Sequence, residues 1–248
     1  MHRAFILFAF VIFTHLIFSS LSLAQYVPKE DRTKGAPTQL DSINRVKYAW
    51  GKISEAEKNL DSCAFDPDAP AIVLYEKGIL RITKFGGVRT KLHRRIKILN
   101  ENGKDQADIV INLFAPEGFM PISGLKAHTI NTDENGDTTL HQIEKKDFYY
   151  SRKSDQYLEV RFTFPNVEVG SIIEYSYNKY SRDFLFPEGW YFQDQIPMLR
   201  SEFEILLSND FEYNVLYQGE TITNKYDKNY SGNVWILEDI PAFKDEPF

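Results

Sequence analysis

The sequence predicts an all-β protein, an antiparallel β-sandwich preceded by a short helical N-terminal preface. Residues 158–164 alternate strictly between apolar and polar side chains, which is typical of a strand with one buried face. From residue 71 onward, turn residues such as Gly, Asn and Asp separate short apolar runs at regular intervals. That spacing favours a sandwich or a related open barrel over alternating α/β layers.

The central stretch, residues 157–177, is interpreted as two antiparallel strands. The first ends at Pro165-Asn166, because proline donates no hydrogen bond to a sheet and asparagine tolerates turn geometry. Gly170-Ser171 opens the second, in which Ile173 and Tyr175 share a face. The short polar connection predicts that the two strands pair with each other.

Residues 1–24 are predicted to be a cleaved signal peptide. Arg3 gives a basic start, residues 4–18 are almost wholly apolar, and Ser22-Leu23-Ala24 supplies small residues before a cut at Gln25. The alternative is a transmembrane anchor, since an apolar stretch of about 20 residues can span a bilayer. The cut site and the basic start favour cleavage. We therefore expect an exported, periplasmic or extracellular protein, associated with the cell envelope, with no membrane span after cleavage.

The rest of the chain is predicted to be a leader followed by one domain. Residues 25–38 are polar with Pro and Gly and are expected to form a flexible leader. Residues 39–248 are expected to form a single β-sandwich domain with N-terminal helices within 39–62. The helices are expected at 39–50 and at 54–60, where Ser54 and Glu57 fit a capping box. Further strands are expected at 71–75, 79–84, 88–99, 106–114, 122–130, 137–143, 146–150, 190–194, 200–207, 211–217 and 233–238, with turns at Lys77-Gly78, Gly86-Gly87, 100–103 and 135–137.

Composition narrows the class of function. A hydrophobic content of 43% with 15% aromatic residues is enough for a folded core. The formal charge of −6 disfavours binding to nucleic acid. The single cysteine, Cys63, excludes an intrachain disulfide. No cofactor is expected, and no metal, because His93, His128 and His141 lie at none of the spacings of a local ligand pair.

No catalytic residue is predicted. Cys63 is the one thiol, and a cysteine-dependent enzyme also needs a histidine base and an orienting group. Asp61 and Asp66 flank Cys63 and are expected to raise its pKa, so Cys63 is interpreted as structural and Cys63→Ser as nearly neutral. Glu159 and Glu174, considered as a paired acid and base, fall on the polar faces of their strands and are expected at the surface.

The strand at 88–99 carries an uninterrupted basic face. Its members are Arg89, Lys91, His93, Arg95 and Lys97, opposite an apolar face that includes Leu92 and Ile96. Because like charges along one face repel, acids on neighbouring strands or a partner should offset them. A salt-bridged face is the simpler interpretation. The alternative is a docking face for an acidic partner or an anionic glycan.

Aromatic residues cluster at 184–192. They are Phe184, Phe186, Trp190, Tyr191 and Phe192. Exposed aromatic residues of this kind stack on sugars or contact proteins, whereas in a β core they are more often buried. Alternation places Trp190 and Phe192 on one face, which we expect to be the core face. The cluster is nevertheless the best candidate for a ligand-binding surface.

Five ordered stretches together resemble the domain-of-unknown-function family 3857. They are WGKIS (50–54), DAPAIVLY (68–75), HRRIKILNENG (93–103), FPNVEVGSIIEY (164–175) and WYFQ (190–193). The resemblance covers roughly residues 48–248. It implies an exported β domain that commonly precedes a transglutaminase-like, papain-fold domain, which would start about where this chain stops. It implies no catalytic residue at any position of this chain.

The function expected from these observations is that of a non-catalytic exported accessory or binding module. It would contact a protein or a glycan, or support a C-terminal papain-fold domain absent from this chain. The alternative is the N-terminal domain of a transglutaminase-like or cysteine peptidase enzyme whose catalytic part is missing here. Its partners would be such a domain, another envelope protein or a glycan, and not nucleic acid.

Overall fold

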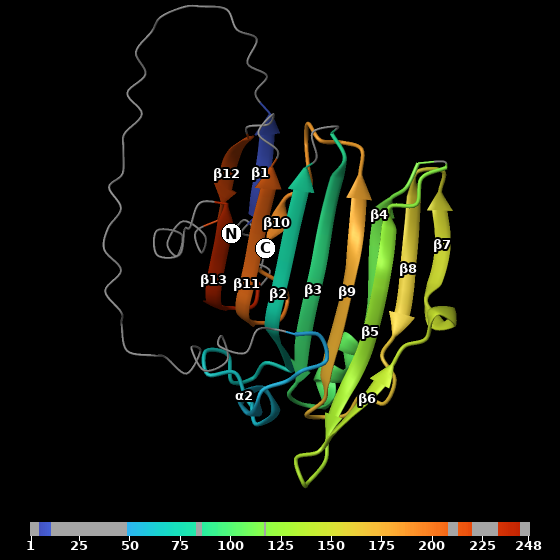
Figure 1. The fold of residues 1–248 in the computed structure, drawn as a ribbon. Coiled ribbons are helices and arrows are strands. Elements are labelled where there is room, and N and C mark those ends of the chain that lie inside the picture. The colour runs from blue at the N-terminus through green and yellow to red at the C-terminus, as the bar shows by residue number, and fades with distance from the viewer. Residues whose placement is uncertain are drawn as a thin grey trace, which may run out of the picture.

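The computed structural model describes residues 5–10, 49–82, 86–116, 118–207, 213–219 and 233–243. These residues form one seven-stranded sheet and two three-stranded sheets (Figure 1). The large sheet has the order β13 (Val234–Ile240), β11 (Met198–Leu207), β2 (Ala71–Ile82), β3 (Val88–Ile98), β9 (Ile172–Ser181), β5 (Ile122–Thr132), β6 (Thr138–Gln142). The small sheets are β10 (Trp190–Tyr191), β1 (Phe5–Phe10), β12 (Tyr213–Gln218), and β4 (Asp108–Phe114), β8 (Tyr157–Thr163), β7 (Tyr149–Ser154).

The helices of the described residues are short. They are α2 (Glu55–Lys58) and the 3-10 helices η1 (Glu101–Ala107) and η2 (Lys145–Asp147). None of the helices in this part of the chain has the length and apolar composition to cross a membrane.

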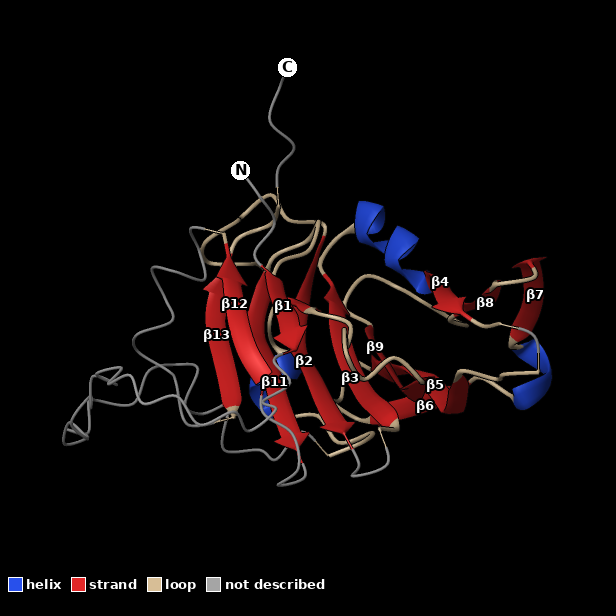
Figure 2. Cartoon of the chain, turned by 90° about the horizontal axis from the view of Figure 1, so that it is seen from above, coloured by secondary structure: helices blue, strands red, loops and turns tan. Residues whose placement is uncertain are grey.

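The main apolar core lies between the large sheet and the sheet of β4, β8 and β7. The alternation in β8 buries Leu158, Val160 and Phe162 in this core. The ring of Phe162 meets Tyr175 of β9 edge to face, with centroids 6.0 Å apart. Figure 2 shows the small sheet on the side of the molecule where β9, β5 and β6 lie. The predicted β-sandwich is therefore confirmed, with sheets packed face to face.

The prediction that the two central strands pair with each other is wrong. β8 pairs with β4 and β7, whereas β9 pairs with β3 and β5. The connection between them, residues 165–171, crosses from one sheet to the other, with Asn166 at φ 53° and Gly170 at φ 91°. The apolar faces of β8 and β9 pack against each other in one core. Each strand therefore forms its ladder hydrogen bonds with other neighbours in its own sheet.

The turn predicted at Lys77-Gly78 is also wrong, because β2 continues through it. Gly78 lies opposite Leu92 of β3 and Phe203 of β11. A Cβ atom added at Gly78 would lie only 2.3 Å from Cζ3 of Trp190. Glycine stands here because an aromatic ring approaches the strand backbone closely, which is a known role of glycine inside strands.

Other local predictions agree with the structure more closely. The capping box at α2 is confirmed, since Glu57 N–H donates to Ser54 Oγ at 3.2 Å and the Glu57 carboxylate accepts from Ser54 N–H at 2.7 Å. Hairpins join β2 to β3 and β5 to β6 as predicted. Residues 100–103, predicted as a tight turn, lead into η1 instead, and β4 begins at Asp108. The leader and nearly all of the helix predicted at 39–50 lie outside the described residues.

The predicted signal peptide contributes a strand in the uncleaved chain. Phe5–Phe10 form β1, which pairs with β10 and β12. Cleavage after Ala24 would remove this strand. The cleavage itself stays a prediction.

The segment 49–60 covers the face of the large sheet opposite the main core. Successive residues of β2 point to opposite faces, and Ile72 and Leu74 belong to a second apolar cluster in which Leu60 and Ile53 also pack. This segment is the short N-terminal preface expected from the sequence, and it forms the third layer of the fold. It lies across the lower end of the sheet in Figure 1.

A buried carboxylate fastens this preface to the sheet. Glu174 of β9 is 0% exposed, and Glu159 of β8 is also buried, so the surface position predicted for both is wrong. Oε1 of Glu174 accepts from Arg95 Nη2 at 2.7 Å and lies 2.6 Å from His93 Nε2. Its Oε2 accepts from the Gly51 N–H at 2.8 Å and lies 2.7 Å from His128 Nε2. Every lone pair of the carboxylate is thereby engaged.

Arg95 extends the same network into α2. Its Nη1 donates to Glu57 Oε1 at 2.6 Å and its Nη2 to the Ala49 carbonyl at 3.1 Å. Burial alone would raise the pKa of Glu174, but the hydrogen bonds from His128 and His93 and the charge of Arg95 hold that pKa well below its ordinary range. The carboxylate therefore stays charged across the physiological pH range.

We expect Glu174→Gln to destabilise the protein strongly. The amide keeps the shape but leaves Arg95 buried with one carboxylate, and breaking a buried pair typically costs about 3–5 kcal/mol. Because the folded pKa of Glu174 is lowered, its contribution is present above the ordinary glutamate pKa of about 4.3 and is lost as the pH falls through the folded value. Urea unfolding at pH 7 and at pH 3 measures both effects.

The matched control is Glu55→Gln on the exposed side of α2, where the Glu55–Lys58 pair leaves the glutamate side chain 77% exposed. This change should stay within about 0.5 kcal/mol. Equal destabilisation by the two substitutions would contradict the role given to Glu174.

Lys97 gives a second prediction on the pH dependence of stability, in a more alkaline range. It is 3% exposed and donates to the Lys58 carbonyl at 2.9 Å, and burial lowers its pKa to about 8 in spite of the nearby Glu57 charge. Between pH 8 and the ordinary lysine pKa of about 10.4, the unfolded chain binds more protons here, so stability rises with pH. The melting temperature of wild type, measured relative to that of Lys97→Met, should therefore rise from pH 7 to pH 10. Lys91→Met, on the exposed part of the same strand, corrects for the pH dependence of the fold. A difference between wild type and Lys97→Met that does not change with pH would refute the lowered pKa.

Candidate binding site beside Trp190

Trp190 forms part of a buried aromatic wall. Its indole is 7% exposed, donates from Nε1 to Ser201 Oγ at 3.0 Å, and stacks on Phe203 with centroids 5.1 Å apart and planes at 11°. Gly78 lies beneath the ring. Phe192, two residues on, is 0% exposed. The prediction that Trp190 and Phe192 face the core is confirmed.

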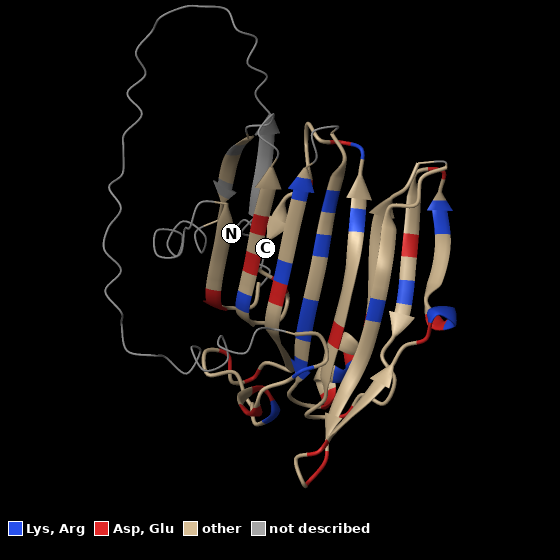
Figure 3. Ribbon diagram, viewed as in Figure 1, with Lys and Arg blue, Asp and Glu red and all other residues tan. Residues whose placement is uncertain are grey.

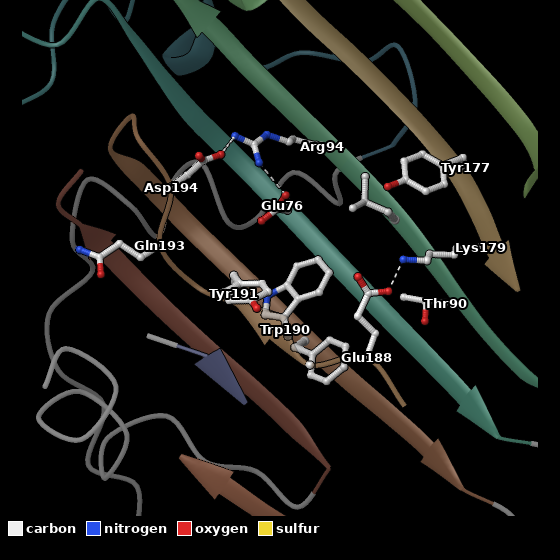
Figure 4. A pocket seen from close by; sticks show the side chains of 13 residues that line it. Glu76, Thr90, Arg94, Tyr177, Lys179, Glu188, Trp190, Tyr191, Gln193 and Asp194 are labelled. Carbon is white, nitrogen blue, oxygen red and sulfur yellow. Dashed lines mark hydrogen bonds and ion pairs between the residues drawn. The ribbon is translucent and has the colours of Figure 1, made fainter. Parts of the chain in front are cut away.

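A pocket of about 290 Å³ opens beside this wall (Figure 4). It is bounded by residues of β2, β3, β9, β10 and β11 together with the segments that precede and follow β10. Its lining residues are Glu76, Thr90, Leu92, Arg94, Tyr177, Lys179, Glu188, Gly189, Trp190, Tyr191, Gln193, Asp194 and Phe203. The volume is near the lower end of small-molecule sites, and the mixture of aromatic and polar groups is typical of them.

A charge triplet, buried at Glu76 and more accessible at Asp194, forms the polar end of the pocket. Arg94 Nη1 donates to Glu76 Oε1 at 2.9 Å, and Nη2 donates to Asp194 (Figure 4). Burial alone would lower the pKa of Arg94, but the Glu76 carboxylate and the nearby Tyr175 and Asp194 raise it. Burial raises the pKa of Glu76, which Arg94 partly offsets. Arg94 Nε is buried and has no hydrogen-bond partner among the described residues, so an acceptor supplied by a ligand would stabilise it.

The rim of the pocket is more accessible. Tyr191 is 50% exposed, and Lys179 forms an ion pair with Glu188 across the opening. Tyr177 lies on the β9 side of the pocket, where burial raises the pKa of its hydroxyl. The phenol therefore stays protonated and can donate a hydrogen bond at physiological pH.

The other predicted aromatic residues are dispersed. Phe184 is half-buried and packs where a side chain at Gly86 would otherwise stand. Phe186 is 66% exposed and lines a separate groove of about 690 Å³, together with Phe114 and Tyr157. Of the five predicted aromatic residues, only Trp190 and Tyr191 line the pocket.

The predicted basic face is divided by the preface. Figure 3 shows Lys and Arg following one another along β3. Arg89 and Lys91 are exposed and His93 is half-buried, but Arg95 and Lys97 are buried beneath residues 49–60. An exposed docking face running through all five residues is therefore wrong. The salt-bridged interpretation holds at Arg95, whose partners are Glu57 and Glu174.

Cys63 lies on the opposite side of the large sheet from the pocket, in the apolar cluster under the preface. It is 1% exposed, and burial, together with the charges of Asp66 and Asp239, raises the pKa of its thiol. Serine would bury a hydroxyl there, which costs about 1–3 kcal/mol, so Cys63→Ala is the milder substitution. Within the described ranges, no group of three His, Cys, Asp or Glu residues is arranged to hold a metal ion.

Sequence reasoning missed the charge triplet of the pocket. A pattern in β3 could have indicated it, because Arg94 occupies the same face as Leu92 and Ile96 and interrupts an otherwise apolar register. A charged residue on a core face needs a buried partner of opposite sign. Glu76, within the apolar run of β2, is the nearest such partner in the ladder, since it lies directly opposite Arg94.

We expect Trp190→Ala to cost about 3–5 kcal/mol, because it removes a large buried ring and leaves a cavity beside Gly78. Tyr191→Ala, at the half-exposed neighbouring position, should change stability by no more than about 0.5 kcal/mol. Thermal and urea unfolding of the two variants tests this assignment. A Trp190→Ala variant that melts within a degree or two of wild type would show that the indole is not part of the core.

The fold is similar to parts of several solved structures. The chain is similar to a crystal structure described as a putative protease from Parabacteroides distasonis, at 13% identity and a TM-score of 0.50 over 72% of this chain. Weaker likenesses are to an M1 zinc metallopeptidase from Deinococcus radiodurans (9% identity, TM-score 0.27, 62% of this chain and 41% of that one) and to leukotriene A4 hydrolase from Saccharomyces cerevisiae (10%, 0.27, 60% and 27%).

These likenesses concern the fold alone. The chain spans 37% of the Parabacteroides protein. No curated protein matches it. A family model described as "Domain of Unknown Function with solved-structure structure (DUF3857)" matches residues 85–244, which include every residue that lines the pocket except Glu76. The match covers well over half of the sequence, and the chain therefore belongs to the DUF3857 family.

Proposed function

We propose that this chain is a non-catalytic exported accessory module that binds a polypeptide through the pocket beside Trp190, in association with a protease domain. The observation that carries the proposal is the pocket itself. It combines a rigid aromatic wall, an exposed Tyr191 at the rim and fixed charges at one end. Tyrosine and tryptophan at such positions supply contact area at little cost in conformational entropy.

The polar end of the pocket suits a peptide backbone. Glu76, Arg94 and Asp194 hold each other in place, so they orient a ligand without needing to rearrange. The buried Arg94 Nε–H lacks an acceptor among the described residues, and a peptide carbonyl would supply one. A sugar hydroxyl is the competing ligand, and the aromatic wall would suit its ring as well.

The lining residues favour binding over catalysis. Of the described residues around the pocket, none is a cysteine or a histidine. Cys63, the one cysteine of the chain, is buried on the other face of the large sheet, and its raised pKa disfavours the thiolate that a nucleophile needs. The apolar segment and the small residues before Gln25 support export.

A second candidate function is supported by the Parabacteroides likeness. A protein described as a putative protease contains this fold in about a third of its length. On this reading the chain is the N-terminal domain of a cysteine peptidase or transglutaminase-like enzyme. Reading the coding sequence beyond Phe248 tests it, since an open frame with Cys, His and Asp segments would support the enzyme.

The proposed binding function is tested with the purified mature chain, residues 25–248, on peptide and glycan arrays. Hits are measured again by calorimetry. Tyr191→Ala should weaken a true pocket ligand at least tenfold, while its melting temperature stays near that of wild type. The matched control is Tyr149→Ala, which removes a 64% exposed tyrosine of β7 that is not part of the pocket lining.

Peptide hits that are lost only in Tyr191→Ala would support the proposal. Equal effects of the two tyrosine substitutions, or the absence of any peptide hit, would contradict it. Hits confined to glycans would assign the pocket to a sugar instead.

A further inference from the structure

β1 occupies the middle of a three-stranded sheet. Its residues Phe5–Phe10 pair antiparallel with all six residues of β12, from Phe5 opposite Gln218 to Phe10 opposite Tyr213. On its other side, Phe5 and Ile6 pair with Tyr191 and Trp190 of β10. Among the described residues, neither β10 nor β12 has any other strand partner. Figure 1 shows β1, in blue, beside β12.

The same six residues lie inside the predicted signal peptide. They belong to the apolar stretch 4–18, which is followed by the expected cut after Ala24. In an exported chain that begins at Gln25, the sheet of β10, β1 and β12 would lack its middle strand. The backbone groups of β10 and β12 that face β1 would then lose their partners, which is costly where water cannot replace them.

The two flanking strands are held in place independently of β1. Tyr213 and Val215 of β12 are half-buried and pack against the main core, and the Tyr213 hydroxyl donates to the Phe184 carbonyl. Trp190 of β10 is fixed by Ser201 and Phe203. The gap between β10 and β12 is therefore bounded by anchored strands, and two facing strand edges form a template for an incoming strand.

We propose that in the mature protein this gap binds an extended apolar segment of a partner polypeptide as an added β-strand, antiparallel to β12. The inference rests on the proposed function, because it assigns a binding mode to an exported module that contacts proteins. The structure carries the argument through the chain's own segment FILFAF, which shows the length, direction and composition of a strand that fits. The contacts are main-chain ladder bonds, which a glycan or a lipid cannot supply at strand spacing.

The ligand used in the test is a synthetic peptide, FILFAF flanked by lysines for solubility and labelled with a fluorophore. It is added to the mature chain 25–248, whose folding is checked by circular dichroism. A matched peptide carries proline in place of Phe8, which removes one backbone donor and disfavours pairing. Polarisation should show binding of the first peptide and at least tenfold weaker binding of the second. The uncleaved chain 1–248, in which β1 fills the gap, should bind the first peptide at least tenfold more weakly than the mature chain.

A third peptide places a photoreactive phenylalanine analogue at the position of Phe8, which lies opposite Val215. Crosslinks within 213–218 or at 190–191 would support the inference. Equal binding of the proline peptide, equal binding to the uncleaved chain or crosslinks elsewhere would overturn it, as would an exported protein that still begins at Met1. A mature chain that stays unfolded with and without the peptide would overturn it too. If the mature chain folds and array ligands depend on Tyr191 although the strand peptide does not bind, only the strand-addition mode fails and the proposed function stands.

Discussion

The ion pair between Glu174 and Arg95 is the constraint on which the arrangement of the layers depends. A charged carboxylate with 0% exposure is tolerated only when its charge and its lone pairs are matched. The matching groups come from β3, from β5 and from the preface. Residues 49–60 must therefore lie on this face of the large sheet. The opposite face of the large sheet packs against the main core. The pocket opens on that face, beside β10 and β11.

The sequence was most informative where one physical rule decided the outcome. Alternation in β8 identified a strand with one buried face, and the capping box identified α2, because both depend on neighbours in the sequence. Prediction from the sequence failed where a residue distant in the chain determines the local structure. No residue near Gly78 in the sequence indicates that Trp190 packs over it, so the sequence predicts a turn where the structure has a glycine needed for close packing. In the same way, the closeness of β8 and β9 in the sequence predicts that they pair, although their apolar faces belong to opposite walls of one core.

The candidate site was predicted only in part for the same reason. The aromatic segment was found, and the inward direction of Trp190 followed from the period of two. The charge triplet was not predicted, because Asp194 reaches Arg94 from a segment 100 residues away.

β10 links the two proposed surfaces. Trp190 and Tyr191 both line the pocket and bound the gap occupied by β1, so a ligand in one place would alter the other through two shared residues.

The parallel pairing of β11 with β2 has a consequence for how the protein reaches its folded state. Lys77 of β2 contacts Glu202 of β11, which lies 125 residues later in the chain. Such a distant contact requires a large loop to close, and folds dominated by distant contacts form slowly. While β11 is still missing, β2 presents an unpaired edge that is apolar over much of its length and prone to aggregation. If the chain crosses a membrane from its N-terminus, that edge emerges first, and a chaperone that covers β2 until β11 arrives would raise the yield of folded protein.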